Sequence, residues 1–215
     1  MSTNPSPADS KVLSTGPLEN KDARWARLVL TTYKDPLGKE RTWESAERST
    51  RPKNSSIDGV GIVAILQKPE GPEIVLQKQF RPPINKVVIE VPAGLVDENE
   101  SAAVSAVREL REETGYVGTV SGQDDWQVGP IMFNDPGFCN TNLNMVHVSV
   151  DMSLNENQNL KPELEENEFI EVFTVPLKHL YAACRRLEAK GYAIDARVGT
   201  LAEGIELSRR WKLFG

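Results

Sequence analysis

The chain contains three acidic residues whose spacing would place them on one side of a helix. Glu109, Glu112 and Glu113 are three and four positions apart, so at about 100° per residue they share one arc. Carboxylates crowded in this way repel one another unless a cation lies between them. Mg²⁺ and Mn²⁺ prefer oxygen ligands of this kind and also bind phosphate oxygens. The spacing therefore indicates metal-dependent chemistry on a phosphate, with a solvated acidic helix face as the alternative.

Neighbouring residues fit the same interpretation. Arg108 lies beside the acidic arc and can pair with a carboxylate, for which Glu100, just before the helix, is the natural candidate. Gly115 suits the left-handed conformation that ends a helix. The chain has only two histidines and two cysteines, which argues against a zinc site built from those residues. A metal used here should be one that prefers oxygen.

A second pattern resembles a phosphate-binding sequence but lacks its context. The residues from Gly59 to Ala64 fit G-x-G-x-x-[GA], which requires a preceding strand and a following helix. Here a polar segment precedes the pattern and the pattern itself has the composition of a buried strand. We therefore interpret Gly59 and Gly61 as positions where a strand packs closely against its neighbours.

The whole stretch from residue 94 to residue 116 resembles the Nudix box, G-x5-E-x7-R-E-U-x-E-E-x-G-U, in which U is aliphatic. The matching residues are Gly94, Glu100, Arg108, Glu109, Leu110, Glu112, Glu113 and Gly115. Only Tyr116 departs from the pattern, at a position that packs rather than reacts. Because so many positions match the pattern at once, we favour it over the alternative of a merely solvated acidic helix face.

Residues outside the box narrow the resemblance to the ADP-ribose pyrophosphatase branch of the Nudix family, in particular its eukaryotic ADP-sugar pyrophosphatases. The segments concerned are Thr42-Trp43-Glu44 with Arg48, residues 79–83, residues 89–97, Asp135-Pro136-Gly137 and Asp195-Ala196-Arg197-Val198. This resemblance implies Mg²⁺-dependent hydrolysis of ADP-ribose to AMP and ribose 5-phosphate. Another ADP-sugar, a GDP-sugar or an oxidised nucleoside diphosphate stays open as the substrate. A catalytically silent nucleotide-binding domain is a further alternative, against which the intact acidic pattern argues.

The resemblance also implies roles for single residues. Mg²⁺, or Mn²⁺ as a substitute, would be held by the backbone carbonyl of Ala93 and by Glu109, Glu112 and Glu113. The catalytic residues would be Glu168, Glu112 and Arg108, with Glu168 orienting the attacking water from an acidic loop. Glu165 and Glu166 are the alternatives for that base.

The implied substrate-binding residues are Trp25, Trp43, Glu44, Arg48, Arg81, Leu95, Asp135 and Gly137. The two tryptophans would stack on adenine and Glu44 would contact the edge of the base, while the two arginines would bind the phosphates. Asp135 and Gly137 would contact the terminal ribose. For Trp25, a core position in a strand is an equal alternative.

These residues must be positioned by a mixture of strands and helices without a regular βαβ period. We expect an α/β fold, the Nudix fold, in which a mixed β-sheet is sandwiched between helices and preceded by an N-terminal β-hairpin-like subdomain. Strands are expected at 25–30, near 42–44, and at 59–66, 74–79, 87–91, 128–133, 144–150 and 169–175, and helices at 101–114, 176–190 and 200–212. Residues 1–20 are expected to form a disordered tail, residues 21–55 the N-terminal β subdomain, and residues 56–215 the Nudix hydrolase domain.

Composition limits the partners. A net charge of −6 over 215 residues argues against binding to nucleic acid or to an anionic membrane. No apolar run approaches the roughly 20 residues of a membrane span, and no secretory signal is expected, so the cytoplasm is the expected location, with the nucleus possible. The resemblance implies a homodimer in which residues 21–55 reach the partner's site, and a small nucleotide-sugar as the substrate.

Overall fold

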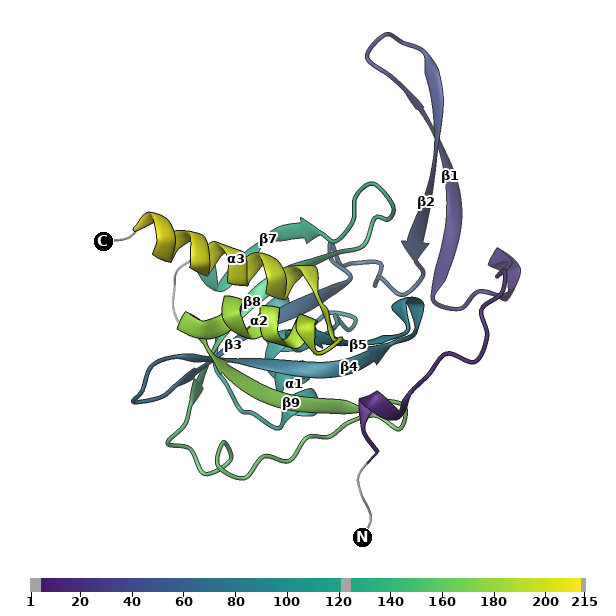
Figure 1. Cartoon of the computed structure of the whole chain (residues 1–215). Helices are drawn as coiled ribbons and strands as arrows, with labels where there is room; N and C mark the ends of the chain where they lie inside the picture. The colour runs from purple at the N-terminus through teal and green to yellow at the C-terminus, as the bar shows by residue number, and fades with distance from the viewer. Residues whose placement is uncertain (1–4, 121–124, 214–215) are drawn as a thin grey trace.

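The computed structural model describes residues 5–120 and 125–213, and it confirms the expected α/β architecture (Figure 1). An eight-stranded mixed sheet has the strand order β10-β5-β4-β3-β8-β7, with β6 paired to β3 and β9 paired to β4. The strands are β3 (Gly59–Gln67), β4 (Glu73–Arg81), β5 (Lys86–Glu90), β6 (Ala93–Leu95), β7 (Val128–Phe133), β8 (Asn142–Asp151), β9 (Ile170–Pro176) and β10 (Ala193–Ile194). The helices are α1 (Ala102–Thr114), α2 (Leu180–Ala189) and α3 (Ala196–Trp211).

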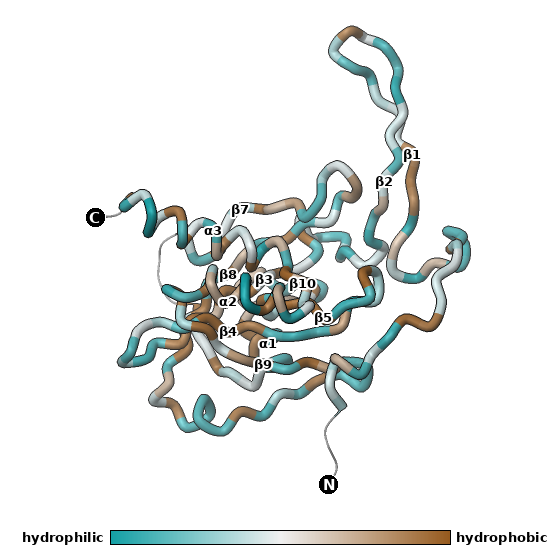
Figure 2. The backbone as a smooth tube through the Cα atoms, viewed as in Figure 1, coloured by the Kyte–Doolittle hydropathy of each residue, from teal (hydrophilic) through white to brown (hydrophobic). Residues whose placement is uncertain are grey.

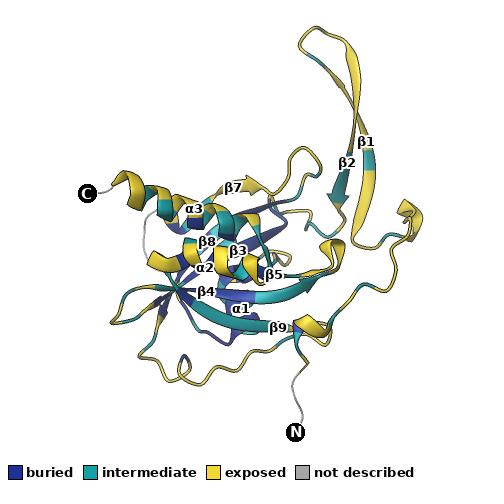
Figure 3. Cartoon of the chain, viewed as in Figure 1, coloured by how far each residue is buried: buried dark blue, intermediate teal, exposed yellow. Residues whose placement is uncertain are grey.

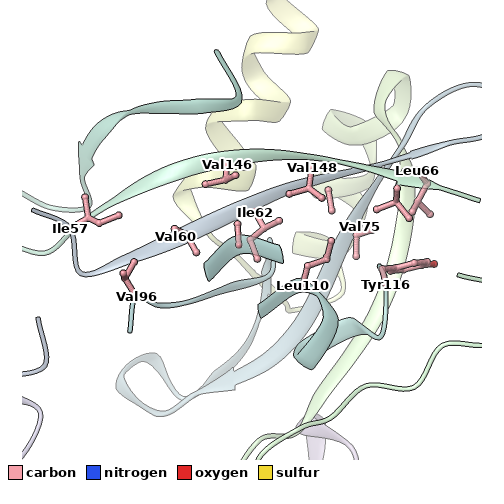
Figure 4. Packing of buried hydrophobic residues seen from close by; sticks show 13 residues of the cluster. Ile57, Val60, Ile62, Leu66, Val75, Val96, Leu110, Tyr116, Val146 and Val148 are labelled. Atoms are coloured by element: carbon pink, nitrogen blue, oxygen red, sulfur yellow. The ribbon is translucent and has the colours of Figure 1, made fainter. Parts of the chain in front are cut away.

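Helices cover both faces of this sheet. Alternate residues of β3 point to opposite faces, so Val60 and Ile62 pack with Leu110 of α1, whereas Val63 packs with Leu180 of α2. Figure 4 shows the first of these two clusters, which lies between α1 and the sheet. Burial of both faces explains the nearly continuous apolar sequence of β3, as expected for a central strand.

The sheet divides between β3 and β4. β3 pairs with β4 only at Ile65 and Leu66. Further along, the same edge of β4 pairs with β5, and the same edge of β3 pairs with β6. The other edge of β4 is paired with β9 throughout residues 73–79. The division therefore opens a gap inside the sheet without leaving β4 unpaired.

The glycines of β3 are confirmed as close-packing positions in a strand. A Cβ on Gly59 would lie 2.4 Å from the carbonyl oxygen of Gly94, and one on Gly61 would lie 2.6 Å from Sδ of Met145. A side chain on Gly59 would meet the backbone of β6, whereas one on Gly61 would displace the side chain of Met145 on β8.

The N-terminal hairpin projects from this domain. β1 (Ala26–Lys34) pairs antiparallel with β2 (Glu40–Arg48), and Gly38, at a φ of 78°, completes the expected turn. Figure 3 shows that most of the hairpin is exposed, and Figure 2 shows that apolar residues nevertheless continue along β1. Leu28 and Leu30 are both 64% exposed, so the hairpin has an apolar face that this single chain does not cover.

Residues 5–12, which the sequence assigns to a disordered tail, contact the domain. Pro7 is buried, Ser6 donates a hydrogen bond from Oγ to Glu171 of β9, and the backbone N–H of Val12 donates to Asn85. A short proline-containing segment thus lies beside β4, β5 and β9, where hydropathy gave no signal for packing.

Some boundaries differ from the expected ones. α2 begins at Leu180 rather than at residue 176, because β9 continues through Pro176 and the residues Leu177–His179 form a 3₁₀ turn. α3 begins at Ala196, since Asp195 caps its first turn. The short strands β6 and β10 were not predicted. Residues 121–124, between Gly118 and Trp126, lie outside the described residues. Within the described part of the chain, no helix is long and apolar enough to span a membrane.

Candidate active site

Helix α1 positions the acidic residues of the Nudix box. Ser101 caps its start, its side chain accepting a hydrogen bond from the N–H of Val104 at 3.3 Å, and Gly115 ends it in the left-handed conformation with a φ of 77°. Ala106 and Leu110 are fully buried against the sheet. With that face fixed in the core, Arg108, Glu109 and Glu112 line a cleft of about 710 Å³.

Arg108 joins three carboxylates. Its Nε and Nη2 donate to the two oxygens of Glu100 at 3.0 and 2.9 Å, and its Nη1 donates to Glu109 and to Glu112, each at 2.9 Å. The hydrogen bonds from Arg108, together with one from Ser105, lower the pKa of Glu100 to about 2. Glu100 is therefore ionised and fixes the arginine, which in turn holds the two cleft carboxylates.

Glu113 is placed differently from its two neighbours. It is buried below the cleft, where it accepts hydrogen bonds from the backbone N–H of Ala93 at 2.9 Å and from Nε2 of Gln77 at 3.3 Å. Burial raises the pKa of Glu113 to about 8, and burial also raises the pKa of Glu109. Two carboxyls that are costly to ionise next to each other mark a place where a cation would be stabilised.

Strand β6 lies against this cluster so closely that its middle residue must be glycine. A Cβ on Gly94 would lie 1.9 Å from Cδ of Glu109. The flanking carbonyl of Leu95 accepts from Nη2 of Arg108 at 3.2 Å. The backbone of β6 is thus part of the site, which accounts for the glycine that opens the box.

The residues present fit a hard divalent cation. Among the residues that the structure describes, no three acidic, histidine or cysteine side chains converge as they lie to hold a metal ion. Instead the Arg108 guanidinium occupies the place between Glu109 and Glu112 as the counter-charge. Ala93, Glu109 and Glu112 line the cleft, and Glu113 supports it from below. Oxygen ligands dominate this set, as Mg²⁺ and Mn²⁺ require.

The acidic loop reaches the same cleft. Glu163, Glu165 and Glu168 line it, while Glu166 is exposed and is not among the lining residues. The backbone N–H of Glu165 donates to the carboxylate of Glu168 at 3.0 Å, which orients that side chain. The charge of Glu168 contributes to the raised pKa of both Glu109 and Glu113. The geometry therefore keeps Glu168 and Glu165 as candidates for the base and sets Glu166 aside.

Three of the expected substrate-binding residues also line the cleft: Arg48, Arg81 and Leu95. Arg81 is held by Glu90, a buried residue, through Nε at 2.9 Å and Nη2 at 2.7 Å. Arg197 lines the cleft as well, and Asp195 holds it in a similar way.

The remaining expected residues lie outside the cleft in this single chain. Trp25 is 67% exposed just before β1, and Glu44 is exposed on β2. Trp43 donates from Nε1 to the carbonyl of Gly137 at 2.9 Å, which joins the hairpin to the turn that contains Asp135. Trp43, an expected adenine contact, thus lies beside the turn that carries the expected ribose contacts, and these residues do not line the cleft. The exposure of Trp25 contradicts the core alternative for that residue.

Sequence reasoning assigned no role to Glu90, Gln77, Asp195 or Arg197. Glu90 and Gln77 lie opposite each other on β5 and β4, within strands whose sequences indicate only burial. A charged or amide residue inside an apolar strand was the available signal, because such groups are rarely buried without a partner.

Comparison with known proteins agrees with the geometry. The NUDIX domain model matches residues 57–198. The chain is 47% identical over 210 residues to an ADP-ribose pyrophosphatase of Saccharomyces cerevisiae, covering 96% of this chain and 88% of that protein. It is 37% identical over 179 residues to an ADP-sugar pyrophosphatase of Mus musculus, covering 82% and 79%. It is 46% identical over 201 residues to an uncharacterized Nudix hydrolase of Schizosaccharomyces pombe, covering 94% and 95%.

The match spans the sheet, α1 and the start of α3, and therefore includes every element that lines the cleft except the end of the hairpin. Proteins of this kind generally depend on a divalent metal ion, in agreement with the oxygen-rich ligand set. The chain belongs to the Nudix hydrolase family.

Proposed function

We propose that this protein hydrolyses the diphosphate of ADP-ribose to AMP and ribose 5-phosphate, with Mg²⁺ as its metal ion. The observation that carries the proposal is the cluster in which Arg108 joins Glu100, Glu109 and Glu112 at one wall of a cleft with the volume of a nucleotide site. The similarity to an ADP-ribose pyrophosphatase of Saccharomyces cerevisiae and to an ADP-sugar pyrophosphatase of Mus musculus supports the choice of an ADP-sugar over other nucleotides.

Metal binding, phosphate binding and activation of the attacking water are assigned to different residues of the chain. Glu109, Glu112 and Glu113, with the carbonyl of Ala93, would hold Mg²⁺, which supplies charge neutralisation at the phosphate when it is bound. Arg81, fixed by Glu90, and Arg48 bind phosphate oxygens on the substrate. Glu168 accepts a proton from the attacking water and orients it toward phosphorus. Positioning and charge, rather than covalent catalysis, are what such a reaction needs.

We further propose a homodimer formed through the hairpin. A two-stranded hairpin is only marginally stable by itself in water, and this one exposes Leu28, Leu30 and Tyr33. A second copy of the chain would cover these side chains. The same contact would bring Trp25 and Glu44 of one subunit toward the cleft of the other, which supports their expected role in binding adenine. Residues 21–55 would then form a shared subdomain.

The substrate proposal is tested by product analysis over a nucleotide panel with and without Mg²⁺. We expect ADP-ribose to be cleaved fastest, with AMP and ribose 5-phosphate as products, and we expect a chelator to abolish turnover. GDP-mannose and 8-oxo-dGDP serve as the competing substrates. If either is cleaved as fast as ADP-ribose, the proposed substrate is wrong although the reaction class stands.

A further inference from the structure

Arg197, in the first turn of α3, has a guanidinium whose orientation is fixed by Asp195. Its Nε donates to Oδ1 of Asp195 at 2.8 Å and its Nη2 donates to Oδ2 at 2.9 Å. Asp195 is itself fixed because it caps α3, accepting from the backbone N–H of Arg197 at 2.8 Å. A two-point pair of this kind sets the plane of the guanidinium, and so it also sets the direction of Nη1.

The guanidinium lies at the cleft, beside β3. Arg197 lines the cleft, and its Nη1 lies 3.6 Å from the point where a Cβ on Gly61 would be. Gly61 lies on β3 opposite Ala93 of β6, at the place where the sheet divides. Nη1 makes no hydrogen bond to any residue within the described ranges. A charged donor is thus available on a residue that lines the cleft.

The surroundings keep this donor charged. Burial would lower the pKa of the Arg197 guanidinium, but its hydrogen bonds with Asp195 and the charges of Glu90 and Glu113 hold that pKa above its ordinary value. Glu90 is already hydrogen-bonded to Arg81, and Glu113 to Ala93 and Gln77. Neither of these two groups is hydrogen-bonded to Nη1 of Arg197.

The ligand that such a donor fits is an anion bound against the carboxylates of α1. Arg108 is already bonded to three carboxylates, and Arg48 is an exposed residue at the end of β2. Arg81, from β4, and Arg197, from α3, both line the cleft, and each is fixed by a single carboxylate. Planar guanidinium groups match phosphate oxygens particularly well.

We propose that Arg197 is a further substrate-binding residue, which donates from Nη1 to an oxygen of the substrate's diphosphate. This inference rests on the proposed function and adds a third arginine to Arg48 and Arg81. Asp195 is then a positioning residue, since it acts on the substrate only through Arg197.

The test compares Arg197→Gln and Arg197→Lys with the wild-type protein and with Arg185→Gln. Arg185 is an exposed arginine of α2 that pairs with Glu188 at 2.6 Å and serves as the matched control. Calorimetry with Mg²⁺ and a methylene-bridged analogue of ADP-ribose, which cannot be hydrolysed, gives the Kd. Steady-state rates with ADP-ribose give KM and kcat separately.

Arg197→Gln should raise both the Kd and the KM by about 10- to 100-fold, the effect of losing a charged hydrogen bond, while kcat changes much less. Arg197→Lys should give an intermediate value, because it keeps the charge but loses the planar fork. Arg185→Gln should bind the analogue like the wild-type protein.

Wild-type Kd and KM values in both Arg197 variants would overturn the proposal. In that event a lower melting temperature would assign Arg197 to the support of α3 alone. The same measurements distinguish a wrong role for Arg197 from a wrong substrate. If the wild-type protein itself neither binds the analogue nor cleaves ADP-ribose, the proposed substrate is wrong, and the Arg197 comparison is made with the nucleoside diphosphate that the wild-type protein does cleave.

Discussion

Gly94→Ala tests whether the contact between β6 and α1 sets the geometry of the catalytic carboxylates. A Cβ at this position would lie 1.9 Å from Cδ of Glu109 and 2.0 and 2.4 Å from its two oxygens. Ordinary contacts between such atoms begin near 3.4 Å. The carboxylate must therefore move by roughly 1.5 Å, and it would lose its hydrogen bond to Arg108.

Activity and stability should respond very differently to this change. Gly94 does not have a positive φ, so alanine can adopt its backbone conformation. The atoms in the way are the end of a flexible side chain, so we expect the free energy of unfolding to fall by only about 1 kcal/mol. A displacement of about 1 Å in a reacting group can cost about 100-fold in rate, and we expect a loss of that size in kcat.

Initial rates of ADP-ribose hydrolysis at saturating Mg²⁺, together with urea unfolding curves, measure the two effects. Gly204→Ala is the matched control, because Gly204 lies in α3 and nothing lies within 4 Å of its Cβ position. The control should keep wild-type activity and gain about 0.5–1 kcal/mol of stability from its helix propensity. A Gly94→Ala protein with the wild-type rate would refute the reasoning, as would a loss of rate no larger than its unfolded fraction.

Three further predictions concern the carboxylates and the hairpin. Glu112→Gln should lower kcat by at least about 100-fold, because it removes a proposed metal ligand. The urea midpoint should change little, because this side chain is partly exposed. Full activity in this variant would contradict the role of Glu112 as a metal ligand. The pKa of Glu113 is raised to about 8 in the native metal-free protein, whereas in the unfolded chain this carboxyl releases its proton near pH 4.5. Between these two pH values the native state binds more protons than the unfolded state. The free energy of unfolding should therefore fall as the pH rises from about 4.5 to 8. Urea titrations in EDTA should show a weaker fall for Glu113→Gln, and equal slopes would count against the burial of this carboxyl. Replacing Leu28 and Leu30 together with Arg should convert the proposed dimer to a monomer by light scattering, whereas Leu207→Arg, at an exposed leucine of α3 outside the hairpin, should not; a monomeric wild-type protein would exclude the dimer.

Local sequence signals were sufficient for α1 and for the cluster around Arg108. Spacings of three and four residues determine which side chains are neighbours on a helix, and Ser101 and Gly115 determine where that helix begins and ends. The hairpin was predicted for a similar reason, since its turn residues and alternation are local features. The main strands were also evident from short apolar runs.

Features that depend on tertiary contacts were not predictable in this way. β6 has only three residues and exists because β3 provides its pairing edge. Arg197 reaches the cleft only because β3 and β4 diverge, which no local pattern indicates. The packing of Pro7 against the sheet and the hydrogen bond from Ser6 to Glu171 depend on residues more than 60 positions away in the sequence. The metal ligands could be named from the family pattern, but that pattern could not show that Glu113 lies below the cleft while Glu109 and Glu112 line it.

The division of the sheet between β3 and β4 has a consequence for how this enzyme can change over time. The proposed metal ligands are carried by α1 and β6, whereas the hairpin and the β7–β8 turn carry the side chains expected to recognise adenine and the terminal ribose. The hydrogen bond from Trp43 to Gly137 joins the two recognition elements to each other, and they share no strand with the catalytic wall of α1 and β6. Substrate preference can therefore drift through surface substitutions in the recognition elements while the catalytic wall stays intact, so related enzymes with this fold can acquire new substrates without rebuilding their chemistry.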